Sequence, residues 1–142
     1  MSVAADALDC PNGTVITPDG KTLIIAESMA NRLTAFTVAD DGTLLDRRIF
    51  AQLGDHIPDG ICLDAEGAIW AASPYSGQVI RVRDGGEIVD SVTIDGAKPY
   101  ACMLGGNDGR DLFVCCAGDH DPAVTMRQRA GRIDVARVTI PG

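Results

Sequence analysis

Residues 58–86 read PDGICLDAEGAIWAASPYSGQVIRVRDGG, and this stretch decides the fold. Three short apolar runs are separated by one turn and one loop, and a second turn follows the last run; these connections are rich in glycine, aspartate, serine and proline. Apolar runs of this length between turn residues are typical of β-strands. The chain lacks the apolar spacing of three and four residues that marks an amphipathic helix. The sequence therefore predicts an all-β protein.

The same pattern occurs three times along the chain. Residues 11–42 read PNGTVITPDGKTLIIAESMANRLTAFTVADDG, and residues 99–138 read PYACMLGGNDGRDLFVCCAGDHDPAVTMRQRAGRIDVARV. Each unit begins with proline, a polar or aromatic residue and a small residue, and then alternates apolar strands with turns. The starting prolines are spaced about 40–50 residues apart, the usual repeat of a four-stranded β-propeller blade. The third strands are predicted at Arg32–Val38, Gln78–Arg83 and Gly131–Val138, and fourth strands at Leu44–Phe50 and Glu87–Ile94.

We predict a single partial propeller domain over residues 1–142, with blades at about 11–57, 58–98 and 99–142. The third blade lacks an outer strand, and residues 1–10 supply a spare one at Ser2–Leu8. Propellers close with about four to eight blades, so three blades amount to half of a six-bladed ring with two apolar flanks. A two-fold homodimer would close that ring and pair Ser2–Leu8 with the partner's third blade. An open arc or a differently packed trimeric arc is the alternative.

Composition excludes several classes of function. The net charge is −8 and the pI about 4.5, which argue against a nucleic-acid surface. No apolar run is long enough to span a membrane, and the N-terminal residues MSVAADALDC do not resemble a signal peptide. The five cysteines lack the spacing of a zinc site and are expected to be buried thiols. We expect a cytoplasmic protein that binds neither nucleic acid nor membranes.

Two side chains occupy equivalent positions at the entries of the first two blades. Asn12 follows Pro11, and Asp59 follows Pro58, each directly before a glycine. Both offer the hard oxygen atoms that Ca²⁺, Mg²⁺ or Mn²⁺ prefer, and a propeller would direct both toward its axis. The alternative is that both are turn residues, which Asn-Gly and Asp-Gly pairs favour anyway.

Two further residues are candidates for the substrate pocket. Tyr100 stands at the equivalent position of the third blade, so that blade contributes no carboxylate there. We expect Tyr100 to line the pocket or pack on it. His120 lies in a long loop of the third blade that could cover the axial mouth, although a solvated histidine is the simpler interpretation of such a loop residue.

Three segments resemble a known family: PNGTVITPDGKTLIIAES, IPDGICLDAEGAIWAA and GGNDGRDLFVCCA. They are similar to the senescence marker protein, gluconolactonase and luciferin-regenerating-enzyme family of six-bladed propellers. The resemblance runs from Pro11 to the C-terminus and matches the C-terminal half of the family's domain. It implies an axial divalent cation with Asn12 and Asp59 as two of its ligands. The family's other ligands, and its substrate-contacting arginine and asparagine, fall in the half that has no counterpart here.

The resemblance also implies an activity, the metal-dependent hydrolysis of sugar lactones or related cyclic esters. The metal, with Ca²⁺ as the first expectation and Mg²⁺, Mn²⁺ or Zn²⁺ as alternatives, would polarise the carbonyl and activate water, and Asp59 would act as ligand and base. Because half of the family's site is missing, activity would depend on a partner chain that completes it. The alternatives are a non-catalytic propeller binding module and an inactive truncated family member.

Overall fold

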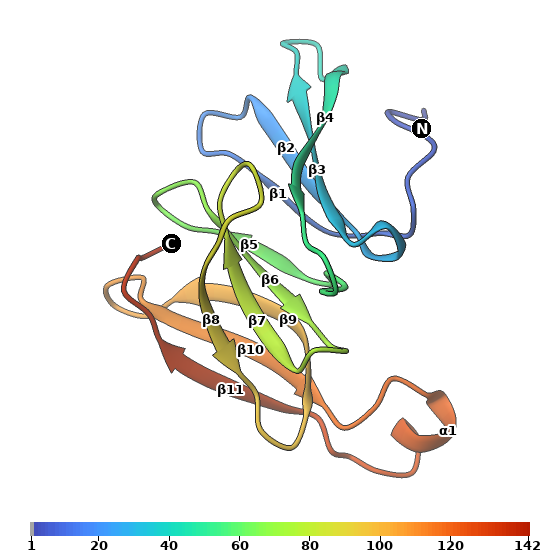
Figure 1. Ribbon diagram of the computed structural model, residues 1–142, viewed down its shortest axis with the longest axis vertical. Coiled ribbons are helices and arrows are strands. Elements are labelled where there is room, and N and C mark those ends of the chain that lie inside the picture. Colours follow the sequence, from blue (N-terminus) through green and yellow to red (C-terminus); the bar gives the residue numbers. More distant parts are fainter. Residues whose placement is uncertain (1) are drawn as a thin grey trace.

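The computed structural model describes residues 2–142 as three antiparallel β-sheets that stand next to one another along the chain (Figure 1). The first sheet has the order β1-β2-β3-β4 and the second the order β5-β6-β7-β8. The third sheet has only three strands, in the order β9-β10-β11. The all-β fold is confirmed.

The strand bounds follow the repeat of the sequence. The first sheet contains β1 (Pro11–Ile16), β2 (Thr22–Glu27), β3 (Arg32–Val38) and β4 (Leu44–Gln52). The second contains β5 (Ile61–Leu63), β6 (Ile69–Ser73), β7 (Gln78–Val82) and β8 (Ile88–Thr93). The third contains β9 (Lys98–Gly105), β10 (Asp111–Ala117) and β11 (Arg132–Arg137). The described helices are one-turn elements, η1 (Ser28–Ala30) and α1 (Pro122–Thr125).

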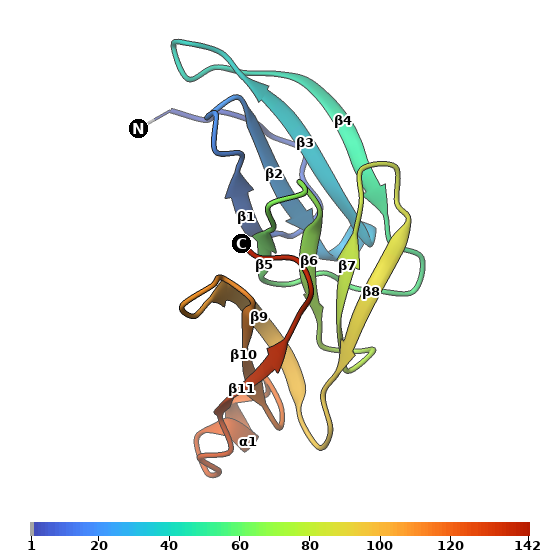
Figure 2. The same cartoon turned by 90° about the vertical axis from the view of Figure 1, so that its left-hand side faces the viewer.

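The sheets are arranged as propeller blades. The first strands of the three sheets contact one another, β1 with β5 and β5 with β9. In Figure 2, β1 and β5 lie on one side of the molecule, and the outer strands β4 and β8 lie on the other. Apolar side chains fill the two spaces between blades: Ile24, Leu33, Phe50, Ile69 and Ile80 in the first space, and Trp70, Val79, Leu112 and Val114 in the second.

Two glycines allow the inner strands to approach each other closely. The Gly13 N–H donates to the Asp59 carbonyl at 3.0 Å, and the Gly60 N–H donates to the Tyr100 carbonyl at 2.9 Å. A Cβ atom on Gly13 would lie 2.5 Å from that carbonyl oxygen, and one on Gly60 would lie 2.7 Å from the Ala101 Cα. The glycines of the two Pro-x-Gly segments are therefore required by backbone packing between blades. In the third blade the equivalent residue is Ala101.

The N-terminal segment differs from the prediction. Residues 2–10 form no strand, so the strand expected over Ser2–Leu8 is not present in the single chain. The Arg47 guanidinium instead donates to the Asp6 carbonyl at 3.1 Å and to the Ala7 carbonyl at 2.9 Å, and so holds the segment against the first blade. A strand requires a neighbour for its ladder of hydrogen bonds, and the incomplete third sheet lies at the opposite end of the chain's arc (Figure 1).

Within residues 2–142, no helix has both the length and the apolar character needed to cross a membrane.

A buried carboxylate joins the N-terminal segment to the first blade. Glu27 is fully buried and accepts hydrogen bonds from Arg32 Nε at 2.9 Å, from the Thr34 hydroxyl and from the Asp9 N–H at 2.8 Å. Arg47 adds an ion pair at 3.3 Å. Burial alone would raise the pKa of Glu27, but the hydrogen bonds from Arg32, Thr34 and the Asp9 N–H outweigh it and lower the pKa to about 2.

This carboxylate makes the stability of the fold depend on pH. The folded pKa of Glu27 lies below its ordinary value of 4.5, so its ionised form stabilises the folded state above pH 4.5. That contribution is lost as the pH falls from 4.5 toward 2. We expect Glu27→Gln to lower the free energy of unfolding at pH 7 by about 3 kcal/mol, because Arg32 and Arg47 lose their buried partner. Urea unfolding across this pH range should show a flatter acid limb for the variant. Glu87→Gln changes an exposed residue and should lose as much stability as the parent when the pH falls from 4.5 toward 2. If Glu27→Gln loses just as much, the assignment of this pH dependence to Glu27 is wrong.

Candidate functional site

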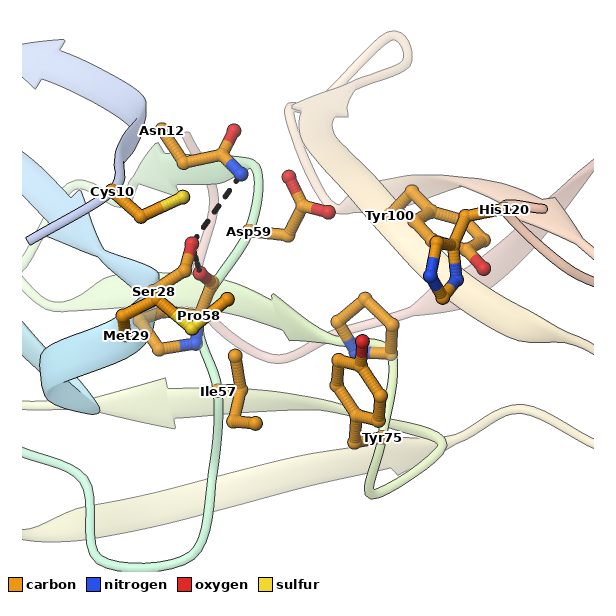
Figure 3. A pocket seen from close by; sticks show the side chains of 11 residues that line it. Cys10, Asn12, Ser28, Met29, Ile57, Pro58, Asp59, Tyr75, Tyr100 and His120 are labelled. Atoms are coloured by element: carbon orange, nitrogen blue, oxygen red, sulfur yellow. Dashed lines mark hydrogen bonds between the residues drawn. The ribbon is translucent and has the colours of Figure 1, made fainter. Parts of the chain in front are cut away.

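A pocket of about 220 Å³ opens where the inner strands of the three blades begin. Its walls come from two kinds of segment, the entries of β1, β5 and β9 and the loops that follow the second strand of each blade (Figure 3). The lining residues are Cys10, Asn12, Ser28, Met29, Ile57, Pro58, Asp59, Pro74, Tyr75, Tyr100 and His120. All four residues that the sequence singled out, Asn12, Asp59, Tyr100 and His120, are therefore brought into one pocket.

Asp59 is fixed by the backbone on both sides. Its N–H donates to the Ala72 carbonyl at 2.8 Å, and its carbonyl accepts from the Gly13 N–H at 3.0 Å. These bonds tie the residue to its own blade and to the preceding one. Its side chain, which is half-buried, is left to enter the pocket beside Asn12 (Figure 3).

Burial raises the pKa of the Asp59 carboxyl, and the nearby Asn12 amide opposes part of that rise. A carboxylate with a raised pKa accepts a proton more readily than an exposed one. Asp59 is therefore a stronger proton acceptor than an exposed aspartate. Asp64, five residues further on, is different, because it is buried in an ion pair with Arg81 at 2.6 Å and caps a turn.

Asn12 is oriented by a chain of two hydrogen bonds. Its Nδ2 donates to Ser28 Oγ at 3.4 Å, and the Ser28 hydroxyl donates to the Pro58 carbonyl at 2.6 Å. The amide nitrogen is thereby directed toward Ser28, and the amide oxygen lies on the opposite side (Figure 3). The oxygen is the atom that a hard cation would bind.

Aromatic side chains form the wall opposite Asn12. The His120 ring meets Tyr75 edge-on at 6.2 Å between centroids and Tyr100 at 6.5 Å. Burial raises the pKa of Tyr100, so its phenol stays protonated. Within residues 2–142, the Tyr100 hydroxyl is buried and has no hydrogen-bond partner, which suits a group that donates to a bound molecule. His120 is largely exposed and stands at the rim.

Sequence reasoning missed the contribution of the loops. Ser28 and Met29 follow β2, and Pro74 and Tyr75 follow β6, at positions equivalent to the loop that carries His120 after β10. The repeat contained the missing signal, because a loop predicted to reach the axial mouth in the third blade implies that its counterparts do so in the other two.

The donor set suits part of a site for a hard divalent cation. Asn12 and Asp59 present an amide oxygen and a carboxylate, whereas Ca²⁺ binds six to eight oxygens and Mg²⁺ six. Across residues 2–142, no group of three or more His, Cys, Asp or Glu side chains is placed to hold a metal ion. This chain can therefore contribute two side chains to such a site, and waters or another chain would supply the rest.

Comparison with known proteins identifies relatives for most of the chain. Residues 1–118 match the family model described as SMP-30/gluconolactonase/LRE-like region. Over 128 residues the chain is 32% identical to regucalcin of Sus scrofa, 34% to that of Oryctolagus cuniculus and 33% to that of Homo sapiens. Each alignment covers 87% of this chain and 43% of the relative. The chain thus spans less than half the length of the regucalcins that it matches.

Solved structures share the fold. A luciferin-regenerating enzyme superposes with a TM-score of 0.82 at 19% identity, covering 99% of this chain and 49% of that one. The calcium-binding protein regucalcin from Agrobacterium tumefaciens gives a TM-score of 0.75 at 26% identity, covering 93% and 47%. A gluconolactonase from Xanthomonas campestris gives 0.66 at 33% identity, covering 78% and 35%.

The family model covers well over half of the chain, and the fold agrees with that match. The chain belongs to the SMP-30/gluconolactonase/LRE-like family.

Proposed function

We propose that the protein is a metal-dependent hydrolase of sugar lactones or related cyclic esters. The observation that carries this proposal is Asp59, a half-buried carboxylate with a raised pKa that lies beside Asn12 in the pocket at the strand entries. Family membership supports a lactonase-type hydrolase, and the similar protein from X. campestris is a gluconolactonase. The five free cysteines suit a reducing compartment, and we propose the cytoplasm.

In this proposal Asn12 and Asp59 hold a divalent cation, with Ca²⁺ as the first choice and Mg²⁺, Mn²⁺ or Zn²⁺ as alternatives. When bound, such a cation supplies Lewis acidity at the ester carbonyl. Asp59 accepts a proton from the water whose oxygen bonds to the carbonyl carbon, and it returns that proton to the ring oxygen as the ring C–O bond breaks. The Tyr100 hydroxyl, which has no partner within residues 2–142, donates a hydrogen bond to the substrate. His120 and Tyr75 pack against the lactone ring.

A lactone assay tests the proposal directly. Five- and six-membered sugar lactones, simple cyclic esters and an open-chain aryl ester would be offered to the protein with Ca²⁺, with chelator, and with each alternative cation restored. We expect hydrolysis of at least one lactone, its loss with chelator and its recovery with the cation. Hydrolysis that is unaffected by chelator would contradict the metal dependence. Failure to hydrolyse any of the lactones would contradict the proposed activity.

A non-catalytic binding module is the second candidate, and an inactive truncated family member is its limiting case. The observation that favours it is the small donor set of Asn12 and Asp59. If a lactone or Ca²⁺ raises the melting temperature while no lactone is hydrolysed, the binding module is the better description. If neither raises it, the pocket is inactive in this chain.

We further propose that two copies of the chain form a six-bladed ring. The outward face of the third sheet supports this idea, because it presents apolar side chains that no other described element covers. Their exposed fractions are 61% for Met103, 41% for Phe113, 69% for Ile133 and 62% for Val135. These residues lie side by side, since Phe113 pairs with both Met103 and Val135 across the strands. In such a ring the N-terminal segment, held on the first blade by Arg47, would lie near the edge strand β11 of the second copy.

The dimer has a direct test in solution. Light scattering should give a mass of twice 14.9 kDa at micromolar concentration. Ile133→Asp places a charge on the apolar face and should return the protein to a monomer, because a buried unpaired charge is strongly unfavourable. Ile88→Asp, on the outer strand of the second blade, is the matched control and should leave the mass unchanged. A monomeric parent, or a dimer insensitive to Ile133→Asp, would rule out this interface.

A further inference from the structure

Two cysteines face each other between the second and third blades. Cys62 lies in β5 and Cys102 in β9, and their sulfur atoms are 3.8 Å apart and share a hydrogen bond. Both side chains are buried, and Cys102 also contacts the Trp70 carbonyl at 3.4 Å. The pair lies just beyond the strand entries that carry Asp59 and Tyr100.

The other cysteines are placed differently. Cys10 and Cys115 are exposed, and the buried Cys116 contacts the Val114 carbonyl of its own strand. Among the described residues, Cys62 and Cys102 are the thiols within hydrogen-bond distance of each other. The pair is therefore a specific feature of this junction, with chemistry that the lactonase proposal does not use.

The strands that carry the pair are held close together. A disulfide requires Cα atoms about 4.4–6.8 Å apart, so it forms only between segments in close contact. Here β5 and β9 are joined by the Gly60–Tyr100 hydrogen bond of 2.9 Å, and even a methyl group on Gly60 would collide with Ala101. Side-chain rotation and a small strand adjustment can then bring the sulfur atoms from 3.8 Å to about 2 Å.

We propose that Cys62 and Cys102 form an oxidation site, at which a low-molecular-weight disulfide converts the two thiols into an intramolecular disulfide linking the second and third blades. One thiolate attacks the oxidant and releases its first thiol, and the other cysteine then attacks the mixed disulfide and releases the second. The two cysteines lose two electrons and two protons, and the oxidant is reduced to two thiols. This inference stands on the cysteine geometry and does not depend on the hydrolase activity.

The geometry leaves the order of the two steps open. The Cys62 and Cys102 sulfur atoms share one hydrogen bond, so either cysteine can attack the oxidant first and the other then resolves the mixed disulfide. Because both are buried, the oxidant reaches them when the third blade moves away from the second, so their oxidation is slower than that of Cys10 and Cys115.

The crosslink has a structural consequence for the pocket. It closes a loop that contains strands β6, β7 and β8 of the second blade, and it fixes the junction between the segments that carry Asp59 and Tyr100. A disulfide of this kind restricts the unfolded chain and raises the melting temperature. We expect a rise of at least about 5 °C, which a dithiol reductant reverses.

The test uses the full chain with Cys10→Ser and Cys115→Ser, which remove the exposed thiols, equilibrated with oxidised glutathione. Intact mass after alkylation should show two thiols lost without a glutathione adduct. Trypsin cleaves after Arg48, Arg81, Arg83 and Arg110, so Cys62 and Cys102 fall in different peptides that a disulfide would join. The melting temperature should rise with the crosslink.

Two further variants distinguish this site from other thiol chemistry. Cys102→Ala in the same background should give neither crosslink nor increase in melting temperature, whereas Cys116→Ala should retain both. The parent chain, mapped in the same way, shows whether the joined peptides form without any substitution. Two alkylatable thiols at Cys62 and Cys102 after equilibration, or a stable glutathione adduct on either without a crosslink, would overturn the proposal.

Discussion

Asp59→Asn is expected to lower kcat for lactone hydrolysis by at least about 100-fold without unfolding the protein. The amide cannot accept the proton of the attacking water, and loss of a positioned general base typically costs 10²–10⁴-fold in rate. It also offers a cation a weaker ligand than a carboxylate, so the rise in melting temperature on adding Ca²⁺ should shrink or disappear. Asp59→Ala, which removes both oxygens, should abolish that response.

The stability of the same variant separates a functional from a structural role. The folded pKa of Asp59 is raised above its ordinary value of 3.8, so ionisation favours the unfolded state, and stability falls as the pH rises from 3.8 toward the folded pKa. Asparagine does not ionise and so avoids the free-energy cost of burying a charge. Asp59→Asn should therefore be as stable as the parent at pH 7 or more stable. Asp55→Asn changes the same charge on an exposed residue that does not line the pocket, and should leave activity intact. Full activity in Asp59→Asn, or a loss explained by unfolding, would contradict the assignment.

Gly13→Ala is expected to destabilise the protein by about 3 kcal/mol or more. The new Cβ would lie 2.5 Å from the Asp59 carbonyl oxygen and 2.6 Å from the Ile61 nitrogen. Both are backbone atoms, so no flexible side chain can move aside, and overpacking of this kind costs about 1–3 kcal/mol or more. Relief of the clash would also stretch the bond from the Gly13 N–H that fixes Asp59.

Urea unfolding measures the effect of Gly13→Ala, and Gly118→Ala is a suitable control. A Cβ on Gly118 would make only an ordinary contact, at 3.7 Å from the Ala130 Cβ, and should change the free energy of unfolding little. If the two alanine variants unfold at the same urea concentration, the inner strands are not as close as described here.

The repeat made much of this fold predictable. Pro-x-Gly starts and Asp-Gly turns recur at blade spacing, so the strands Arg32–Val38 and Gln78–Val82 could be predicted almost to the residue. The same repeat predicted that Asn12 and Asp59 share one pocket, because equivalent residues of a propeller face one axis.

Other features depend on contacts that no periodicity encodes. Residues 2–10 have apolar character, but Arg47 and Glu27 hold them against the first blade without a strand ladder. Tyr75 and Met29 reach the pocket from loops, where side-chain direction follows the turn and leaves no alternating pattern. The contact between Cys62 and Cys102 joins strands of different blades, and only the spacing between the blades reveals it.

The methyl group of Ala101 distinguishes the entry of the third blade from the entries of the first two. Gly13 and Gly60 each allow a neighbouring strand to lie almost against the backbone, whereas Ala101 occupies the same place at the open end of the arc. We expect a strand that docks there, whichever chain supplies it, to meet the Ala101 methyl group. The spacing at that junction should therefore be wider than at the two junctions where glycine lets the neighbouring backbone come close.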